Sequence, residues 1–215
     1  MKKIGCKRCL AVIFAVLLAV ALSGCDQNAT NASKYVKTAL ELQCFGNVDD
    51  YAKYVDITKQ QAQNLYEQDI QSVVSSFTAV VGIEELSDSA QAQFVELFKE
   101  IYRHCDFEVG TAAPVREGSK IYNLEVTVKP VNLISLAGDE LIALYHNTTN
   151  TNDDTYVEGV LKILLKHLPN IGNEEAQVIK AQVQMSVGGV FYMDSENAQK
   201  VTNALVNYSA VLSTE

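Results

Sequence analysis

The stretch YNLEVTVK, residues 122–129, decides the fold class of this 215-residue chain. Its apolar and polar residues alternate without a break, which is typical of a β-strand with one buried and one exposed face. Pro130 follows at once and predicts the end of the strand, because proline cannot donate a hydrogen bond to a sheet. The apolar face of the predicted strand carries Tyr122, Leu124, Val126 and Val128.

Three other segments have strand patterns. Phe107 and Val109 open a strand before the first stretch, with a turn expected around Gly118. Residues 179–187 alternate in the same way, and Gly188-Gly189 suits a two-residue hairpin turn into 190–193. The sequence therefore predicts about four antiparallel strands in two hairpins.

Helical periodicity dominates the remainder of the chain. Apolar residues recur every three or four positions over 31–43, 58–81 and 88–104, and shorter helical patterns cover 48–55, 135–147, 153–168 and the segment after Asp194. Thr58 and Gln61 have the spacing of a capping box. Runs of helix and of antiparallel strand, without regular strand–helix alternation, predict an α+β fold. We expect the 58–81 and 88–104 helices to cover the apolar face of the sheet.

The first 25 residues resemble the export signal of bacterial lipoproteins. Four basic residues precede Leu10–Leu22, an apolar run that is shorter than the roughly 20 residues of a membrane span. The tetrad Leu22-Ser23-Gly24-Cys25 matches the lipobox of that class. The resemblance implies cleavage between Gly24 and Cys25, removal of the signal peptide 1–24, and a diacylglycerol with acyl chains such as palmitate on the Cys25 sulfur. Two acyl chains give a stable membrane anchor.

Export as a lipoprotein predicts how the mature chain is organised. We expect 25–30 to form the lipidated cysteine and a short polar tether, and 31–215 to form one α+β domain. Even fully extended, such a tether spans only about 20 Å. The domain is therefore expected close to the cell membrane, on its extracytoplasmic face.

The charge of the mature chain limits the classes of partner that it can bind. Lys2, Lys3, Lys7 and Arg8 all lie in the predicted leader, so 13 of the 17 basic residues and all 26 acidic residues remain after cleavage, a net charge of −13. Such a polyanion is repelled by phosphate backbones, which argues against nucleic acid as a partner.

Two cysteines of the mature chain, Cys44 and Cys105, remain in addition to Cys25. They form either a disulfide, which an extracytoplasmic compartment permits, or two buried thiols.

Three stretches of the mature part resemble a known family. These are TKQQAQNLYEQD at 58–69, FEV at 107–109 and VTVKPVN at 126–132. They are similar to a family of small bacterial lipoproteins without an assigned activity, found mainly in low-G+C Gram-positive bacteria and assigned to the nuclear-transport-factor-2-like fold. The resemblance covers roughly residues 30–210. It implies a cone-shaped domain with a curved sheet. The helical segment 135–168, expected as an insertion between the two hairpins, departs from the simplest form of that cone.

A cone of that kind is packed at one end and open at the other. If it holds a pocket, the pocket should be apolar with a polar mouth, lined by Tyr122, Leu124, Val126, Val128, Phe94 and Phe98. A completely filled core is the alternative reading of the same residues.

No catalytic, metal-binding or cofactor motif stands out in the sequence. His104, Cys105 and Asp106 are consecutive, but neighbouring residues of a strand point to opposite faces and cannot chelate one ion together. We therefore expect no catalytic residue, no metal and no cofactor. The predicted function is a membrane-anchored, non-enzymatic binding module for a small apolar ligand or an envelope protein. The alternatives are a structural accessory of the envelope without a ligand, and an enzyme that uses acid–base chemistry.

Overall fold

The computed structural model describes residues 25–208 and residue 211. The predicted signal peptide 1–24 lies outside the described residues, as do 209–210 and 212–215. The helices are α1 (Cys25–Phe45), α2 (Val48–Val55), α3 (Lys59–Val80), α4 (Asp88–Tyr102), α5 (Leu133–His146), α6 (Asp154–His167), the 3₁₀ turn η1 (Leu168–Asn170) and α7 (Ser195–Leu205). The strands are β1 (Asp106–Val109), β2 (Ala113–Pro114), β3 (Ile121–Lys129), β4 (Gln177–Met185) and β5 (Phe191–Tyr192).

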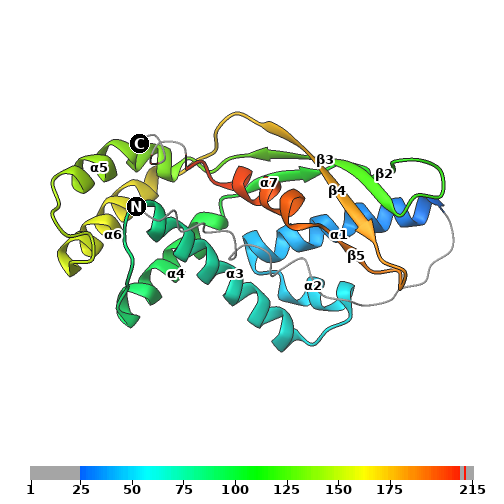
Figure 1. Cartoon of the computed structure of the whole chain (residues 1–215), viewed down its shortest axis with the longest axis horizontal. Helices are drawn as coiled ribbons and strands as arrows, with labels where there is room; N and C mark the ends of the chain where they lie inside the picture. The colour runs from blue at the N-terminus through cyan, green and yellow to red at the C-terminus, as the bar shows by residue number, and fades with distance from the viewer. Residues whose placement is uncertain (1–24, 209–210, 212–215) are drawn as a thin grey trace, which may run out of the picture.

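The strands form one curled antiparallel sheet around β3, which confirms the predicted α+β class (Figure 1). β3 pairs with β1, β2 and β4, and β5 extends the sheet from β4. Along β3 the buried and exposed residues alternate as its sequence predicts. The expectation of about four strands was one short for the described residues, because β2 has only two residues and therefore shows no periodicity.

Helices α1 and α7 lie against the buried face of the sheet, whereas α3 and α4 pack on each other and on α1. The expectation that α3 and α4 cover the sheet was therefore wrong. An amphipathic stripe shows that a helix has a buried side but does not identify what covers it. In α1, Val36, Leu40 and Leu42 are all fully buried because this helix lies between the sheet and the α2–α4 layer.

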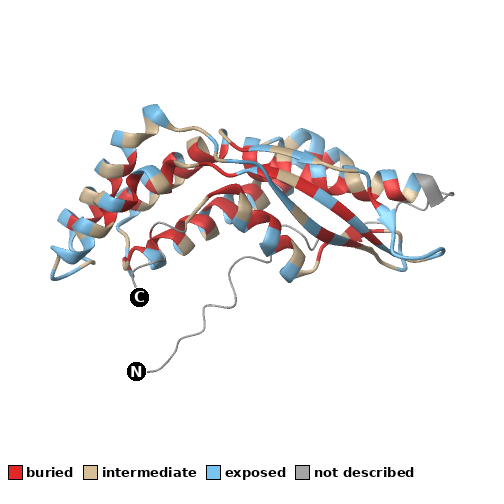
Figure 2. Cartoon of the chain, turned by 90° about the horizontal axis from the view of Figure 1, so that it is seen from above, coloured by how far each residue is buried: buried red, intermediate tan, exposed pale blue. Residues whose placement is uncertain are grey.

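The described domain is elongated, and its two ends differ (Figures 1 and 2). One end holds the start of α1, the β2–β3 loop and the β4–β5 turn, and the other holds the α5–α6 hairpin. α5 and α6 approach each other closely at Gly159, where an added Cβ would lie 3.0 Å from a methyl group of Leu144. The Tyr156 hydroxyl ties the hairpin to the end of α3 by donating to the Val81 carbonyl oxygen at 2.6 Å.

The first helix begins at Cys25 and not near residue 31. The predicted tether 25–30 is therefore helical, and this part of the expected organisation was wrong. The cause lies in small apolar residues that continue the buried stripe of α1 toward its start: Ala29 and Ala32 are 9% and 0% exposed. Their spacing of three places both on the side of the helix that packs on the core.

Candidate functional site

The residues predicted to line a pocket form a packed core instead. Tyr122, Leu124, Val126 and Val128 are at most 3% exposed, and Phe94 and Phe98 are fully buried. The two phenylalanines pack beside Phe77 of α3, with ring centroids 6.1 and 5.2 Å apart. The burial of these side chains fits the filled-core alternative, and α1 and α7 cover the sheet residues among them.

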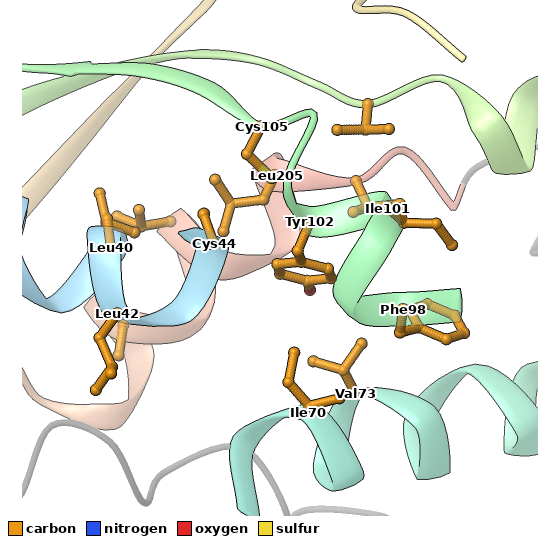
Figure 3. Close-up of a cluster of buried hydrophobic side chains, with 14 of the residues drawn as sticks. Leu40, Leu42, Cys44, Ile70, Val73, Phe98, Ile101, Tyr102, Cys105 and Leu205 are labelled. Carbon is orange, nitrogen blue, oxygen red and sulfur yellow. The ribbon is translucent and has the colours of Figure 1, made fainter. Parts of the chain in front are cut away.

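A pocket of about 380 Å³ opens elsewhere, between α3, the C-terminal end of α7 and the start of β4. Figure 3 shows Val73 of α3 and Tyr102 of α4, both of which line the pocket, with their side chains facing one another. The apolar and aromatic lining residues are Val73, Phe77, Val80, Tyr102, Pro130, Ala204 and Tyr208. The polar lining residues are Ser76, Gln177, Thr202, Asn203 and Asn207.

Two phenol groups give this pocket its strongest polar feature. The hydroxyls of Tyr102 and Tyr208 share a hydrogen bond, and the Tyr208 ring lies 6.5 Å from the ring of Phe77. Removal from water raises the pKa of both phenols well above the ordinary value of 10. Both groups are therefore neutral near pH 7, and they contribute hydroxyl dipoles, not charges, to the pocket lining.

Next to the pocket lies a buried polar cluster of Gln43, Cys44, Asp69 and Cys105. The Gln43 side-chain amide donates a hydrogen bond to the Asp69 carboxyl group, whose Oδ2 has no hydrogen-bond partner among the described residues. Burial raises the pKa of Asp69 to about 7 despite that hydrogen bond. Asp69 was not predicted as a site residue, although its spacing from Tyr66 and Val73 on the apolar stripe of 58–81 was a usable signal.

The structure brings the predicted cysteine pair together. Cys44 and Cys105 are free thiols here, both buried and in hydrogen-bond contact with each other. Burial is the main reason that the pKa of the Cys44 thiol is raised well above its ordinary value. A buried neutral thiol is a poor nucleophile, so this geometry suits a structural pair more than a reactive centre.

A second, larger groove of about 690 Å³ runs between α1, α2 and the β4–β5 turn. The Lys34 ammonium lies 5.3 Å from the centroid of the Tyr54 ring, and the Tyr54 hydroxyl donates to the Asn31 carbonyl oxygen at 2.6 Å. Its charged lining residues are Lys34, Lys37, Glu41, Asp50 and Lys53. Both signs are present, so this groove does not select a ligand by charge alone.

The predicted lipidation site is the first described residue. Cys25 begins α1, while Gly24 on the other side of the predicted cleavage point lies outside the described residues. Within 25–208, no helix has the length and apolar character needed to cross a membrane. The same part of the chain contains no cluster of three or more His, Cys, Asp or Glu side chains suited to a metal ion.

Comparison with known proteins gives a likeness of fold. No family model matches the chain, and no curated protein matches it either. The crystal structure of YcdA from Bacillus subtilis subsp. subtilis strain 168, a candidate lipoprotein, is similar, with a TM-score of 0.58 and 15% sequence identity. The likeness covers 84% of this chain and 57% of that one, so this chain spans little more than half the length of YcdA.

Proposed function

We propose that this chain is a lipid-anchored extracytoplasmic protein that binds a small apolar ligand, without catalysis, in the pocket between α3 and α7. The proposed anchor is a diacylglycerol on Cys25. The lipobox and the fold shared with a candidate lipoprotein support this membrane-anchored location. The proposed cone is of the nuclear-transport-factor-2-like kind, for which the curled antiparallel sheet is the support.

The apolar pocket is the observation that carries the ligand-binding proposal. Its volume of about 380 Å³ lies within the range of small-molecule sites, which are mostly apolar with a few polar groups that orient the ligand. Aromatic rings and aliphatic side chains form the walls, and the Tyr102 and Tyr208 hydroxyls with the nearby amides supply the polar groups.

The lining also favours binding over catalysis. Among the described residues that line the pocket, none is an Asp, Glu, His, Cys or Lys. General acid–base catalysis needs a group that exchanges protons near the working pH. The raised pKa values of the two tyrosines place them far from that range.

Binding of an apolar fluorescent dye tests the proposal. The core residues that the structure describes all follow residue 28, so a lipid-free form of residues 26–215 retains every one of them. We expect N-phenyl-1-naphthylamine to bind it saturably with one dye per chain. Ser76→Phe should place a ring in the space that the dye would occupy. We therefore expect it to weaken dye binding at least about tenfold.

Gln71→Phe is the matched control, because Gln71 is an exposed residue of the same helix that does not line the pocket. Equal dye affinity in wild type and Ser76→Phe would contradict the proposal. Absence of saturable binding in wild type would favour the alternative of an envelope accessory that engages a protein or no ligand.

A further inference from the structure

The end of the domain at which α1 begins gathers three segments that are distant in sequence: 25–34, 110–121 and 185–191. We refer to these segments as the anchor end, because the first of them starts at Cys25. Both views show them together at one end of the long axis (Figures 1 and 2). The Ser33 hydroxyl donates to the Gly110 carbonyl oxygen at 2.9 Å and accepts from the Ala112 N–H at 2.7 Å. The Met185 N–H donates to the Lys120 carbonyl oxygen at 2.8 Å.

The anchor end exposes aliphatic side chains at its tips. Val187 is 96% exposed, Val115 is 49% exposed and Ile121 is 37% exposed. A single exposed apolar residue is ordinary on a protein surface. Here the Val115 N–H donates to the Ile121 carbonyl oxygen at 2.9 Å, so two of the three residues are neighbours. Val187 lies on the turn after β4, the strand that pairs with β3. Contact with an apolar surface would remove these side chains from water, which is favourable.

The turn that carries Val187 is braced in this conformation. The Ser186 N–H donates to the Val190 carbonyl oxygen at 2.8 Å, the Gly189 N–H donates to the Ser186 carbonyl oxygen at 3.1 Å, and the Val190 N–H donates to the Ser186 hydroxyl at 3.1 Å. Gly189 has a φ of +82°, which glycine adopts without strain. Val187 is therefore held away from the domain by the backbone around it.

The charge of the anchor end is opposite to that of the chain as a whole. Its three segments contain Lys34, Arg116 and Lys120 against Asp26 and Glu117, whereas residues 25–215 carry a net charge of −13. Neither Arg116 nor Lys120 forms an ion pair with another described residue. Both are exposed. Free cations beside exposed aliphatic tips suit an anionic lipid surface, which offers phosphates above an apolar layer.

We propose that the anchor end docks on the anionic membrane surface that holds Cys25, with Val187 in the boundary between headgroups and acyl chains and with Arg116 and Lys120 facing lipid phosphates. This inference rests on the proposed lipidation of Cys25. It adds a fixed orientation to the anchor, because contacts on three segments restrict the tilt of the domain.

Tryptophan fluorescence tests the docking in the full lipidated chain, because the sequence contains no tryptophan. Val187→Trp introduces a single reporter on the exposed turn, and Leu165→Trp introduces a matched control at the opposite end, where Leu165 is 51% exposed. Each protein is produced with its own signal and reconstituted into vesicles of phosphatidylglycerol and phosphatidylcholine. With brominated acyl chains in the vesicles, we expect the Val187→Trp emission to fall by about half or more and the Leu165→Trp emission to stay nearly unchanged.

A double charge-reversal variant tests whether Arg116 and Lys120 contribute to docking on the anionic surface. Arg116→Glu with Lys120→Glu, added to Val187→Trp, should reduce the quenching on anionic vesicles but not on vesicles of phosphatidylcholine alone. Val115→Trp repeats the depth measurement from the neighbouring loop.

The outcomes separate this inference from the anchor on which it rests. Proteins that fail to float with vesicles lack the lipid, which overturns the anchor and the docking together. Proteins that float, but in which Val187→Trp is quenched no more than Leu165→Trp, keep the anchor and overturn the docking. A blue-shifted Val187→Trp spectrum that brominated lipid does not quench would show that a second copy of the chain covers the turn, and it would also overturn the docking.

Discussion

Asp69 is an acidic residue in the core, only 7% exposed, with Gln43 as its hydrogen-bond partner. Burial raises its folded-state pKa from 3.8 to about 7, whereas in the unfolded chain the carboxyl ionises near its ordinary value. Between roughly pH 4 and pH 7 the unfolded chain releases this proton and the folded chain keeps it. The free energy of unfolding should therefore fall as the pH rises through this window and level off above it.

Asp69→Asn should remove this fall, because an amide of similar shape does not titrate. At pH 8 the variant should be more stable than wild type, by roughly 4 kcal/mol at most on the scale of 1.4 kcal/mol per pKa unit. Near pH 4 the two should be alike. Urea unfolding at both pH values measures the difference. The exposed Asp139→Asn serves as control and should keep the pH dependence of wild type, and a pH dependence unchanged in Asp69→Asn would refute the assignment.

Cys44 and Cys105 carry a second prediction at this scale. Their thiols are in contact and separated by 61 positions in sequence. If an envelope oxidant joins them, closure of that loop should stabilise the fold by roughly 4 kcal/mol on the chain-entropy model. Residues 26–215 contain only these two cysteines. If they are joined, thiol titration of the secreted, denatured domain should find none free. Cys44→Ala should expose one thiol as control, and two free thiols in wild type would exclude the bond.

Local signals in the sequence predicted single residues well where the partner lies nearby. Thr58 and Gln61 form the predicted capping box, with the Gln61 N–H donating to the Thr58 hydroxyl oxygen at 3.2 Å. The contact of Cys44 with Cys105 and the unpartnered carboxyl oxygen of Asp69 depend on tertiary packing. No spacing rule gives such features, because they arise between segments that are distant in sequence.

At the scale of elements, periodicity located the long helices and β3 but not their neighbours. The alternation along 122–128 identified the buried face, and α1 and α7, not α3 and α4, cover it. Ala29 and Ala32 extend α1 to Cys25, although small residues give too weak a hydrophobic signal to reveal that extension. The pocket between α3 and α7 was missed for a different reason: its lining residues come from five separate segments, which only the tertiary fold brings together.

Leu124 of β3 tests the packing of the sheet. Leu124→Ala should lower the free energy of unfolding by about 2–5 kcal/mol, because a well-packed core leaves a cavity where the side chain was. Val178→Ala on β4 is the control: Val178 is 57% exposed, and its loss should change stability by only about 0.5 kcal/mol. Chemical denaturation of both variants checks the prediction. A loss near 1 kcal/mol for Leu124→Ala would show that this face is not tightly packed.

For the whole molecule, the central prediction concerns Cys25. Cys25→Ser should leave an uncleaved precursor and abolish incorporation of radioactive fatty acid, because the acyl chains need the sulfur. Cys44→Ser in the same full chain should still be labelled and processed, since that cysteine lies in the core. Labelling is followed by gel electrophoresis of cells grown with labelled palmitate. Equal labelling of Cys25→Ser and wild type would contradict the anchor.

The start of α1 at Cys25 has a consequence for how this molecule meets others. A helix of 21 residues is about 31 Å long, and its buried side is fixed to the sheet and to α2–α4. A lipid on its first residue would therefore hold the α5–α6 hairpin at a fixed height above the bilayer. Copies that diffuse in one leaflet would then collide with equivalent surfaces at the same level. Their encounters would be two-dimensional, and a partner would have to reach that level to touch the outer hairpin.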